Sequence, residues 1–296
     1  MRLQHAHAER APQRVVVIGA KGFVGGAVCR RLAAAGIDHL GLGRREVDLK
    51  AADAVEKLAA HLRPGDAVVV AAARAPCKST AMLAENMIML KAIVDALGRV
   101  PVSHVVHVSS DAVYADEPIP LTESSPTAPG TLHGAMHVAR DVALASELKM
   151  PLAIVRPSAI YGLADPHDSY GPNRFRRLAA QGKDIVLFGE GEERRDHVLI
   201  DDVAELIVRI LLRGSTGTLN IATGAVHSFR SIAEMVVAAA ASKIAITSIP
   251  RSGPMPHNGY RPFDSAACRA AFPDFSYVSL PEGIRRVQRE MEQAGG

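Results

Sequence analysis

Aromatic residues are scarce in this 296-residue chain: tryptophan is absent, and phenylalanine and tyrosine together make up only 4% of it. Proteins that bind nucleic acids commonly interleave aromatic and basic side chains or concentrate basic residues on one face, and this sequence has no such stripe. The formal charge of +3 is also small. We therefore expect no nucleic-acid partner, and small anionic ligands fit the composition better.

Cysteine is nearly as rare. The three cysteines, Cys29, Cys77 and Cys268, are far apart, odd in number and not arranged as C-x-x-C. This pattern argues against a disulfide framework and against a structural zinc site. It is typical of a protein from a reducing compartment.

The chain also lacks a long apolar run, although its hydrophobic share is 48%. Each apolar stretch is interrupted well before the roughly 20 residues that a membrane-spanning helix needs, so we expect no membrane partner. Residues 1–13 contain His5, His7 and Arg10 and have no apolar core of a secretory signal. We expect residues 1–13 to form a flexible N-terminal tail and the protein to be cytoplasmic.

What the sequence does contain is a repeated alternation of short apolar strands with amphipathic helices. Strands are predicted at 39–42, 67–71, 103–108, 152–155 and 218–222, and helices at 24–35, 50–61, 80–97, 134–148 and 200–212. Such alternation predicts an α/β fold, a Rossmann-type doubly wound parallel sheet with a smaller C-terminal substrate lobe. We assign 14–162 to the sheet domain, with 196–225 returning to it, and 163–195 and 226–296 to the lobe. The Pro- and Gly-rich segments 163–172 and 251–262 are expected to be loops near the site.

A glycine-rich turn follows the first strand. The strand Val15-Val16-Val17-Ile18 leads directly into glycines spaced G-x-x-G-x-x-G, and a helix follows. In this arrangement one glycine permits the tight turn, one lets the backbone approach a pyrophosphate and one allows close packing of helix on strand. The helix N-terminus favours a bound anion. The residues expected to contact a dinucleotide here and after the third strand are Gly19, Lys21, Gly22, Phe23, Val24, Gly25, Ala71 and Ala72.

The end of the second strand bears on the choice of cofactor. It reads Gly43-Arg44-Arg45, whereas an acidic residue there would bind the ribose 2′-OH of NAD. Arginine accommodates the 2′-phosphate of NADP, so Arg44 and Arg45 favour NADP(H) over NAD(H). Glu46 and Asp48 lie near enough to serve as the acid if the loop is set differently, which leaves NAD(H) open.

Further landmarks follow in order along the chain. They are Asn86 in a helix, Ser109-Ser110-Asp111-Ala112-Val113-Tyr114 after a strand, Arg156-Pro157-Ser158-Ala159-Ile160-Tyr161-Gly162, and Arg195-Asp196-His197 leading into Asp201-Asp202-Val203-Ala204. This series resembles the extended short-chain dehydrogenase/reductases, and within them the NAD-dependent epimerases and dehydratases that act on nucleotide-linked sugars. The resemblance implies a Rossmann domain that binds NAD(P) and a split C-terminal lobe that binds the nucleotide sugar.

The resemblance also implies roles for individual residues. Ser110 would polarise the reacting carbonyl or alcohol, although a serine that caps the next turn would look the same. Arg195 would hold the nucleotide diphosphate, the alternative being an ion pair with Asp196 or Asp201. Further expected cofactor contacts are Asp48, Asn86, His137 and Pro157. Further expected substrate contacts are Asp111, Asn173 and Arg261, and a solvated basic surface is the alternative for Asn173 and Arg261.

The catalytic pair departs from the family pattern. Where the family has Tyr-x-x-x-Lys, this chain has His133-Gly134-Ala135-Met136-His137. In one interpretation His133 is the acid/base and His137 binds the nicotinamide ribose. In a second, redox chemistry is lost or moved to a group such as Tyr114 or Tyr161, and the protein binds a nucleotide ligand. In a third, His133, His137 and Asp141 bind a divalent metal, which Gly134 makes less favourable because H-E-x-x-H sites need a glutamate there. We expect no metal.

The two residues that follow Ser110 narrow the choice of reaction type. The sugar dehydratases of the family have Thr-Asp-Glu there, and this chain has Ser110-Asp111-Ala112, which does not fit a 4,6-dehydratase. Reductases and epimerases remain. Because cells keep NADPH mainly for reduction, the two arginines favour a reductase of a nucleotide-linked keto sugar, with an epimerase or a nucleotide-binding protein without redox activity as alternatives. The apolar helix between Ala81 and Leu97 suggests a homodimer.

Overall fold

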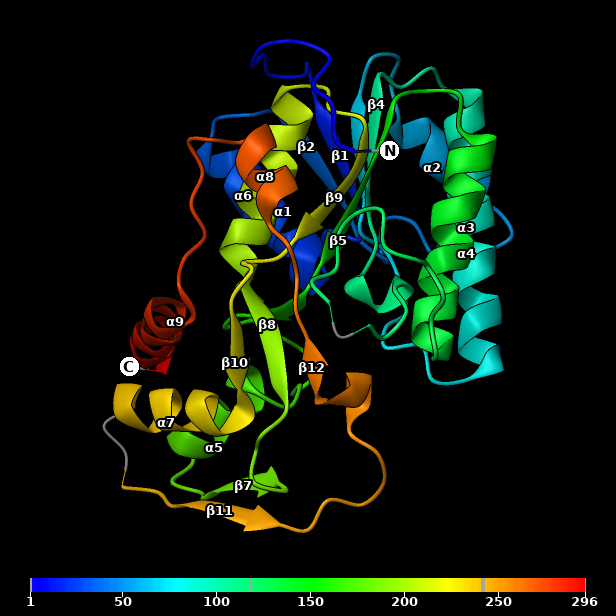
Figure 1. Cartoon of the computed structure of the whole chain (residues 1–296). Coiled ribbons are helices and arrows are strands. Elements are labelled where there is room, and N and C mark those ends of the chain that lie inside the picture. Colours follow the sequence, from blue (N-terminus) through cyan, green and yellow to red (C-terminus); the bar gives the residue numbers. More distant parts are fainter. Residues whose placement is uncertain (1, 118, 241–242, 296) are drawn as a thin grey trace.

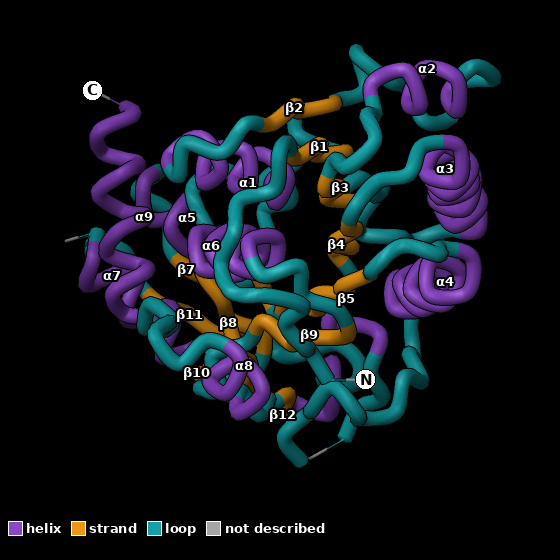
Figure 2. The backbone as a smooth tube through the Cα atoms, turned by 90° about the horizontal axis from the view of Figure 1, so that it is seen from above, coloured by secondary structure: helices purple, strands orange, loops and turns teal. Residues whose placement is uncertain are grey.

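A six-stranded parallel sheet forms the centre of the larger part of the molecule. The computed structural model describes residues 2–117, 119–240 and 243–295. The strands are β1 (Val15–Ile18), β2 (His39–Leu42), β3 (Ala67–Val70), β4 (His104–Val108), β5 (Leu152–Pro157) and β9 (Gly217–Ile221). They pair in the order β2-β1-β3-β4-β5-β9, and every neighbouring pair is parallel (Figure 2). The predicted doubly wound Rossmann-type sheet is confirmed.

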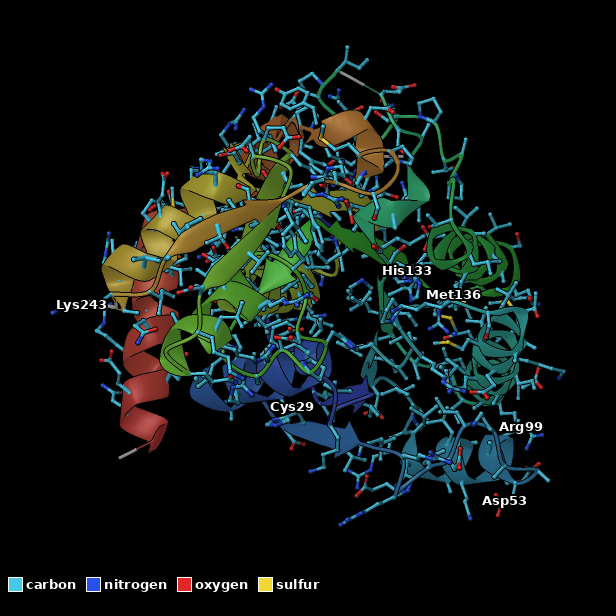
Figure 3. The ribbon with its side chains drawn as sticks, turned by 90° about the horizontal axis from the view of Figure 1, so that it is seen from below. Cys29, Asp53, Arg99, His133, Met136 and Lys243 are labelled. Atoms are coloured by element: carbon cyan, nitrogen blue, oxygen red, sulfur yellow. The ribbon has the colours of Figure 1, made fainter. Side chains whose placement is uncertain are left out.

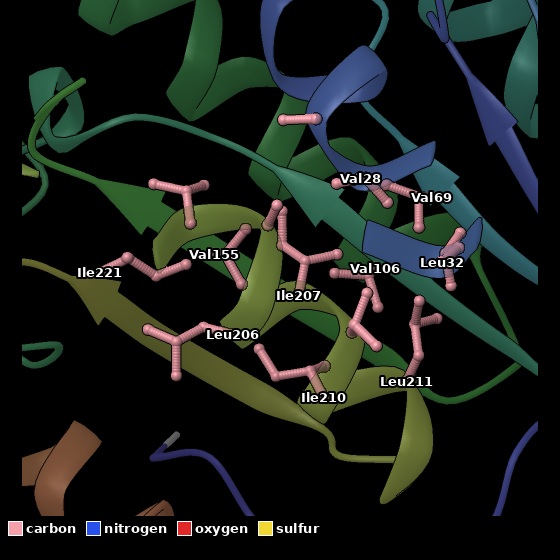
Figure 4. Close-up of a cluster of buried hydrophobic side chains, with 14 of the residues drawn as sticks. Val28, Leu32, Val69, Val106, Val155, Leu206, Ile207, Ile210, Leu211 and Ile221 are labelled. Carbon is pink, nitrogen blue, oxygen red and sulfur yellow. The ribbon is translucent and has the colours of Figure 1, made fainter. Parts of the chain in front are cut away.

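Helices cover both faces of this sheet, as Figure 2 shows. On one face lie α1 (Phe23–Ala34) and α6 (Ile200–Leu212), and on the other lie α2 (Ala54–His61), α3 (Thr80–Arg99) and α4 (Leu132–Glu147). The β-branched side chains of β1 and β3 alternate between two buried cores, which is why these strands are apolar on both faces. Figure 4 shows Ile207 and Ile210 of α6 packed against Val106 and Val155 of the sheet.

The smaller lobe lies below the carboxyl ends of the strands in Figure 1. Its main sheet contains β6 (Ala159–Tyr161), β8 (Arg194–Leu199), β10 (Val226–Ser228) and β12 (Tyr260–Arg261), and a second ladder joins β7 (Ile185–Phe188) to β11 (Ile246–Ile249). Three helices pack around a separate core: α5 (Pro172–Ala180), α7 (Phe229–Ala239) and α9 (Leu280–Gly295). The chain therefore crosses between the sheet domain and the lobe several times.

Three elements lie on the other side of the expected boundaries. Strand β6 lies within 14–162, which was assigned to the sheet domain, but it pairs with β8 of the lobe. Most of strand β8 lies in the predicted return segment 196–225, but the strand pairs with strands of the lobe, so the return begins with α6. Helix α8 (Ala266–Ala271) lies in the segment expected to belong to the lobe, yet Cys268 and Phe272 are buried in the core of the sheet domain. Cys268 lies in α8 and Phe272 directly follows it, and α8 contacts β9.

The N-terminal segment is hydrogen-bonded to the sheet domain. Arg2 and Gln4 form bridges with Thr218 and Thr216, and His5 hydrogen-bonds Ser215 Oγ at 2.8 Å. Strand β9 is the edge of the sheet, and its free backbone groups offer hydrogen bonds that residues 2–4 complete. Met1 of the expected tail lies outside the described residues. Among the helices of the described part of the chain, none is long and apolar enough to span a membrane.

The sheet has one topological switch point. β2 lies on one side of β1 and β3 on the other, so the connections that leave the carboxyl ends of β1 and β3 diverge. Ligands of doubly wound sheets bind at such a point. Here the glycine turn after β1 faces Ala71 and Ala72, which follow β3 directly.

Candidate active site

A groove made of three connected cavities runs along the carboxyl edge of the sheet. The cofactor cavity, about 610 Å³, lies between the loops that follow β1, β2 and β3. The central cavity, about 890 Å³, lies between the sheet domain and the lobe. The distal cavity, about 330 Å³, reaches Arg195 and Arg261. The first two share Gly22 and Ala71, and the last two share Ser110 and His133.

The glycine turn leaves the start of α1 open to the groove. Gly19 has φ +95°, and a Cβ there would come within 2.6 Å of the backbone nitrogen of Ala72. A Cβ at Gly25 would collide with the carbonyl oxygen of Gly19, so α1 can approach β1 only with glycine at this position. Gly22 is the N-cap of α1 and lines both the cofactor and the central cavity. The N–H groups of the first helical turn therefore face the groove, which suits a bound pyrophosphate.

Most of the expected cofactor residues line these two cavities. In the cofactor cavity these are Gly19, Lys21, Gly22, Arg44, Asp48, Ala71 and Ala72. In the central cavity these are Gly22, Phe23, Val24, Ala71, His137 and Pro157. Gly25, Arg45 and Asn86 lie outside the cavity linings found in the described residues.

Asn86 forms hydrogen bonds with the backbone of the loop that follows β3. It is fully buried, and its Oδ1 accepts a hydrogen bond from the Arg74 N–H at 2.9 Å. Its Nδ2 donates to the carbonyl oxygens of Arg74 and Met82 at 3.0 and 2.8 Å. The side chain thus fixes the wall of the cofactor cavity instead of reaching into it.

Four cations and two carboxylates line the cofactor cavity: Lys21, Arg44, Lys50, Arg74, Asp48 and Glu85. Arg44 pairs with Asp48 at 3.2 Å, whereas Lys21 has no ion-pair partner in the described part of the chain. Glu46, the alternative acid, folds back to accept the Gly43 N–H at 2.7 Å, and this backbone hydrogen bond lowers the pKa of Glu46.

Ser110 stands at the start of a short 3-10 helix, Asp111–Val113. Its Oγ accepts from the Ala112 N–H at 3.1 Å, so it does cap this turn, and its proton is directed to Asp111 Oδ1 at 3.3 Å. The same hydroxyl lines both the central and the distal cavity. Capping and donation to a substrate oxygen are therefore geometrically compatible.

His133 and His137 lie one turn apart on α4, whose N-cap Thr131 accepts from the Gly134 N–H. Their rings meet edge to face with centroids 4.8 Å apart. Figure 3 shows His133 on the side of α4 toward the middle of the molecule. The Nδ1 of His133 accepts from the Cys77 N–H at 3.4 Å, which favours the tautomer with the proton on Nε2.

Both rings are neutral near pH 7. Burial lowers the pKa of His133, and the charge of Asp111 opposes this only in part. Burial, followed by the neighbouring His133 and His107, brings the pKa of His137 well below its ordinary value. His137 therefore does not supply the positive charge that a lysine would supply at this position.

The metal-binding alternative finds no support in the position of Asp141. This carboxylate accepts two hydrogen bonds from Arg156, at 3.2 and 3.0 Å. Within the described residues no group of three or more His, Cys, Asp or Glu side chains is arranged to hold a metal ion.

The distal cavity contains the expected arginines, each already paired. Arg261 donates to Asp111 Oδ2 at 2.9 Å and to Asp116 Oδ1 at 2.7 Å. Arg195 pairs with Glu193 at 2.7 Å, which is neither of the partners considered from the sequence. Asn173 is buried below β6, where its Oδ1 accepts the Gly162 N–H, and it lies outside the cavity linings of the described residues.

Comparison with known proteins places these features in a family. The model of the NAD dependent epimerase/dehydratase family matches residues 15–222. The chain belongs to this family. A UDP-glucose 4-epimerase of Mycolicibacterium smegmatis is 28% identical over 254 residues, 74% of this chain and 80% of that protein. A dTDP-4-dehydro-6-deoxy-D-allose reductase of Streptomyces bikiniensis is 26% identical over 271 residues, 77% of this chain and 81% of that protein.

The fold comparison agrees. A UDP-glucose 4-epimerase of Thermus thermophilus, solved in complex with NAD, superposes with a TM-score of 0.82 at 23% identity, covering 95% of this chain and 99% of that chain. The resemblance to the epimerase/dehydratase family noted from the sequence is confirmed. The relatives include epimerases, a reductase, a dehydrogenase and a dehydratase, so membership of the family does not decide which reaction this member performs.

Several lining residues of the central and distal cavities were not foreseen individually, among them Lys78, His167 and His257. His167 and His257 lie in the segments 163–172 and 251–262, which were expected to be loops near the site. Lys78 lines both the central and the distal cavity and follows a Pro-containing loop. Its sequence context carries no motif, so only the fold reveals its position.

Proposed function

We propose that this protein reduces a keto group on a nucleotide-linked sugar with NADPH. The observation that carries the proposal is the continuous groove, which has the glycine turn at one end, Ser110 and His133 in the middle and two arginines at the other end. Such a groove would hold a dinucleotide, a reacting carbonyl and a second phosphate group in line. Reductases and epimerases both occur among the relatives.

The preference for NADPH rests on the cations of the cofactor cavity. Arg44 is 78% exposed at its side chain and lines the cavity beside Lys21, while Glu46 is held by the backbone of Gly43. A 2′-phosphate would be attracted to Arg44 and Lys21, whereas the lining carboxylate that could bind an unmodified ribose, Asp48, is already paired with Arg44. NAD(H) as a substitute is expected to bind more weakly.

Arg45 provides a matched control for this assignment because it lies next to Arg44 but outside the cavity lining. We expect Arg44→Ser to weaken NADPH binding about tenfold or more and to leave NADH binding nearly unchanged. Arg45→Ser should leave both affinities within about twofold. Equal losses for the two cofactors in Arg44→Ser would contradict the role of Arg44.

The chemistry follows from the donors in the central cavity. Bound NADPH would supply the hydride. Ser110 and the Nε2–H of His133 would donate hydrogen bonds to the carbonyl oxygen, where negative charge develops during the reaction. A neutral imidazole can polarise a carbonyl in this way without first being protonated.

Lys78, Arg195 and Arg261 would hold the diphosphate of the substrate in the distal cavity. Arg261 is presently bound to Asp111 and Asp116, so substrate binding would exchange these carboxylates for phosphate oxygens.

The test is incubation with NADPH and a panel of nucleotide-linked keto and hydroxy sugars, following nicotinamide absorbance and product mass. Cofactor oxidation with a product two hydrogens heavier supports the proposal. A product of unchanged mass with no net cofactor consumption would indicate an epimerase. Tight ligand binding without any product would indicate a family member that no longer performs the reaction.

We further propose that two copies associate through α3 and α4, which lie side by side in Figure 1. Ile88 of α3 and Val142 of α4 are 52% and 59% exposed, large values for apolar side chains on neighbouring helices. Sedimentation should show a dimer that Ile88→Glu together with Val142→Glu converts to a monomer. A wild-type monomer at micromolar concentration would contradict this.

A further inference from the structure

A separate cavity, which we call the amino-edge cavity, lies at the opposite edge of the six-stranded sheet from the groove. Its volume is about 570 Å³, and it shares no lining residue with the three cavities of the groove. The residues that come just before β1, β3, β4, β5 and β9 line it, namely Gln13, Gly65, Ser103, Pro151 and Gly214. Parallel strands all begin at one edge of a sheet, so these residues meet where the strands start.

The N-terminal segment forms the outer wall of the amino-edge cavity. In Figure 1 this blue segment loops over the top of the sheet domain, away from the lobe. Its backbone is fixed there, because the Ala6 N–H donates to the Arg213 carbonyl oxygen at 3.1 Å and the Arg10 N–H donates to the Leu212 carbonyl oxygen at 2.8 Å. His7 and Arg10 line the cavity and are exposed, so a ligand can reach them from solvent.

The ionisable groups of the amino-edge cavity are all basic. Arg10 has no ion-pair partner in the described part of the chain, and no carboxylate of that part lines the cavity. The nearest acids along the chain are engaged elsewhere: Glu9 pairs with Arg213 at 3.1 Å, and Asp66 pairs with Arg14 at 2.6 Å. An unpaired guanidinium in a site without an acid attracts an anion.

His104, the first residue of β4, lines the same cavity from the sheet side and is 4% exposed. Its Nε2 lies 2.7 Å from the Ser215 carbonyl oxygen, and because a carbonyl can only accept, Nε2 is the nitrogen that carries the proton. Burial lowers the pKa of His104, the Ser215 hydrogen bond opposes this, and the charge of His7 lowers the pKa further. The ring is therefore neutral near pH 7, and Nδ1 is a hydrogen-bond acceptor.

The Nδ1 of His104 is buried and has no hydrogen-bond partner in the described part of the chain. Folded proteins rarely leave a buried acceptor in this condition. One water molecule could donate to it, but a water takes up about 30 Å³, a small share of the amino-edge cavity. A cavity of about 570 Å³ has the size of a small-molecule site, so a larger donor can be accommodated beside His104.

We propose that the amino-edge cavity binds a small anion that also carries hydroxyl groups, a chemistry that sugar phosphates and hydroxycarboxylic acids share. Arg10 would bind the anionic group of the ligand, and Nδ1 of His104 would accept a hydrogen bond from one of its hydroxyls. The apolar side chains of Pro12, Pro151 and Leu211 would contact its carbon atoms. The inference does not depend on the proposed function, because the cavity lies apart from the groove.

The test uses two matched pairs of small molecules, with binding to the full chain measured by calorimetry. L-malate and succinate differ by one hydroxyl group, whereas glucose 1-phosphate and glucose differ by the phosphate. We expect L-malate or glucose 1-phosphate to bind with a Kd of about 1 mM or lower. Succinate should bind about tenfold more weakly than L-malate, because it cannot donate to His104, and glucose should not bind. Binding of one anion but not the other supports the site and identifies which of the two classes it takes.

Two further measurements locate the bound anion. In protein labelled with ¹⁵N-histidine, the Nδ1 resonance of His104 should move on binding, because this nitrogen gains a hydrogen bond. Arg10→Ser should weaken binding about tenfold or more. Arg2→Ser is the matched control, since Arg2 is exposed on the same segment but outside the cavity lining, and it should leave the Kd within about twofold. Arg195→Ser, a change in the groove, should leave both the Kd and the His104 response as they are.

Three results would overturn the inference. The first is that none of the four molecules binds at about 10 mM. The second is binding that Arg195→Ser abolishes and Arg10→Ser does not, which would place the anion in the groove. The third is equal binding of L-malate and succinate without a His104 response, which would show unselective attraction of anions. All of these measurements are made without NADPH and without turnover, so their failure and the failure of the proposed reductase are distinguishable.

Discussion

The carboxylate of Asp202 is buried, where a negative charge is unfavourable. Removing this charge by substitution provides a quantitative test of the structure. The side chain of Asp202 lies at the start of α6, where Oδ2 accepts the Val278 N–H at 2.8 Å. Burial and the nearby carboxylates of Asp201 and Glu205 raise the pKa of Asp202 to about 6, although the Val278 hydrogen bond opposes the shift. A rise of about two units corresponds to about 3 kcal/mol.

The sign of the effect follows from proton linkage. The folded state binds the Asp202 proton more tightly than the unfolded state does, so this group contributes stability at acidic pH. That contribution is lost as pH rises through about 6. Above neutral pH the full cost of the buried charge is present. Asp202→Asn removes the charge and keeps an oxygen that can accept the Val278 N–H.

We expect Asp202→Asn to increase the free energy of unfolding by about 2 kcal/mol at pH 8, since the buried amide group offsets about 1 kcal/mol of the gain. At pH 4.5 the difference from wild type should be close to zero. Urea denaturation across this pH range measures it. Asp201→Asn, an exposed change in the same motif, should stay within about 0.5 kcal/mol at both pH values. A difference for Asp202→Asn that does not vary with pH, or a loss of stability at pH 8, would refute the reasoning.

Three further substitutions test the groove. His133→Phe should lower kcat at least about 100-fold and leave NADPH affinity unchanged in a fluorescence titration; an unchanged kcat would remove His133 from the mechanism. Asn86→Ala should lower the free energy of unfolding, measured by urea denaturation, by about 1–3 kcal/mol and should weaken NADPH binding, because the backbone of Arg74 loses its hydrogen-bond partners. Wild-type stability together with wild-type affinity would contradict that role. Gly25→Ala should abolish NADPH binding, whereas Gly98→Ala, where a Cβ meets open space on α3, should not; calorimetry decides between these outcomes.

The cofactor end of the groove could be predicted because its determinants are consecutive in the chain. β1, the glycine turn and α1 are local structures, and the apolar strand, Gly19 and Gly22 each meet a requirement set by nearby backbone. The alternation of strands and helices likewise predicts a parallel sheet without knowledge of any single contact.

At the distal end of the groove, the sequence predicted which residues are present but not which side chains they pair with. Arg195 and Arg261 line the cavity as expected, but their partners, Glu193, Asp111 and Asp116, are set by how the lobe folds back on the sheet domain. The N-terminal segment shows the same limit, because its polar composition suggests a free tail, and only the open edge of β9 gives it a hydrogen-bonding partner.

The sequence by itself determined the order of the elements, the dinucleotide turn and the identity of the histidine pair, because these depend on neighbouring residues and on their periodicity. Tertiary structure alone decided that Asn86 supports a wall instead of touching the groove, and that both histidines are neutral. It also brought His107, Asp141 and Arg156 together from β4, α4 and β5. Burial and long-range charge act through space, and the distances through which they act exist only after the sheet and its covering helices have packed.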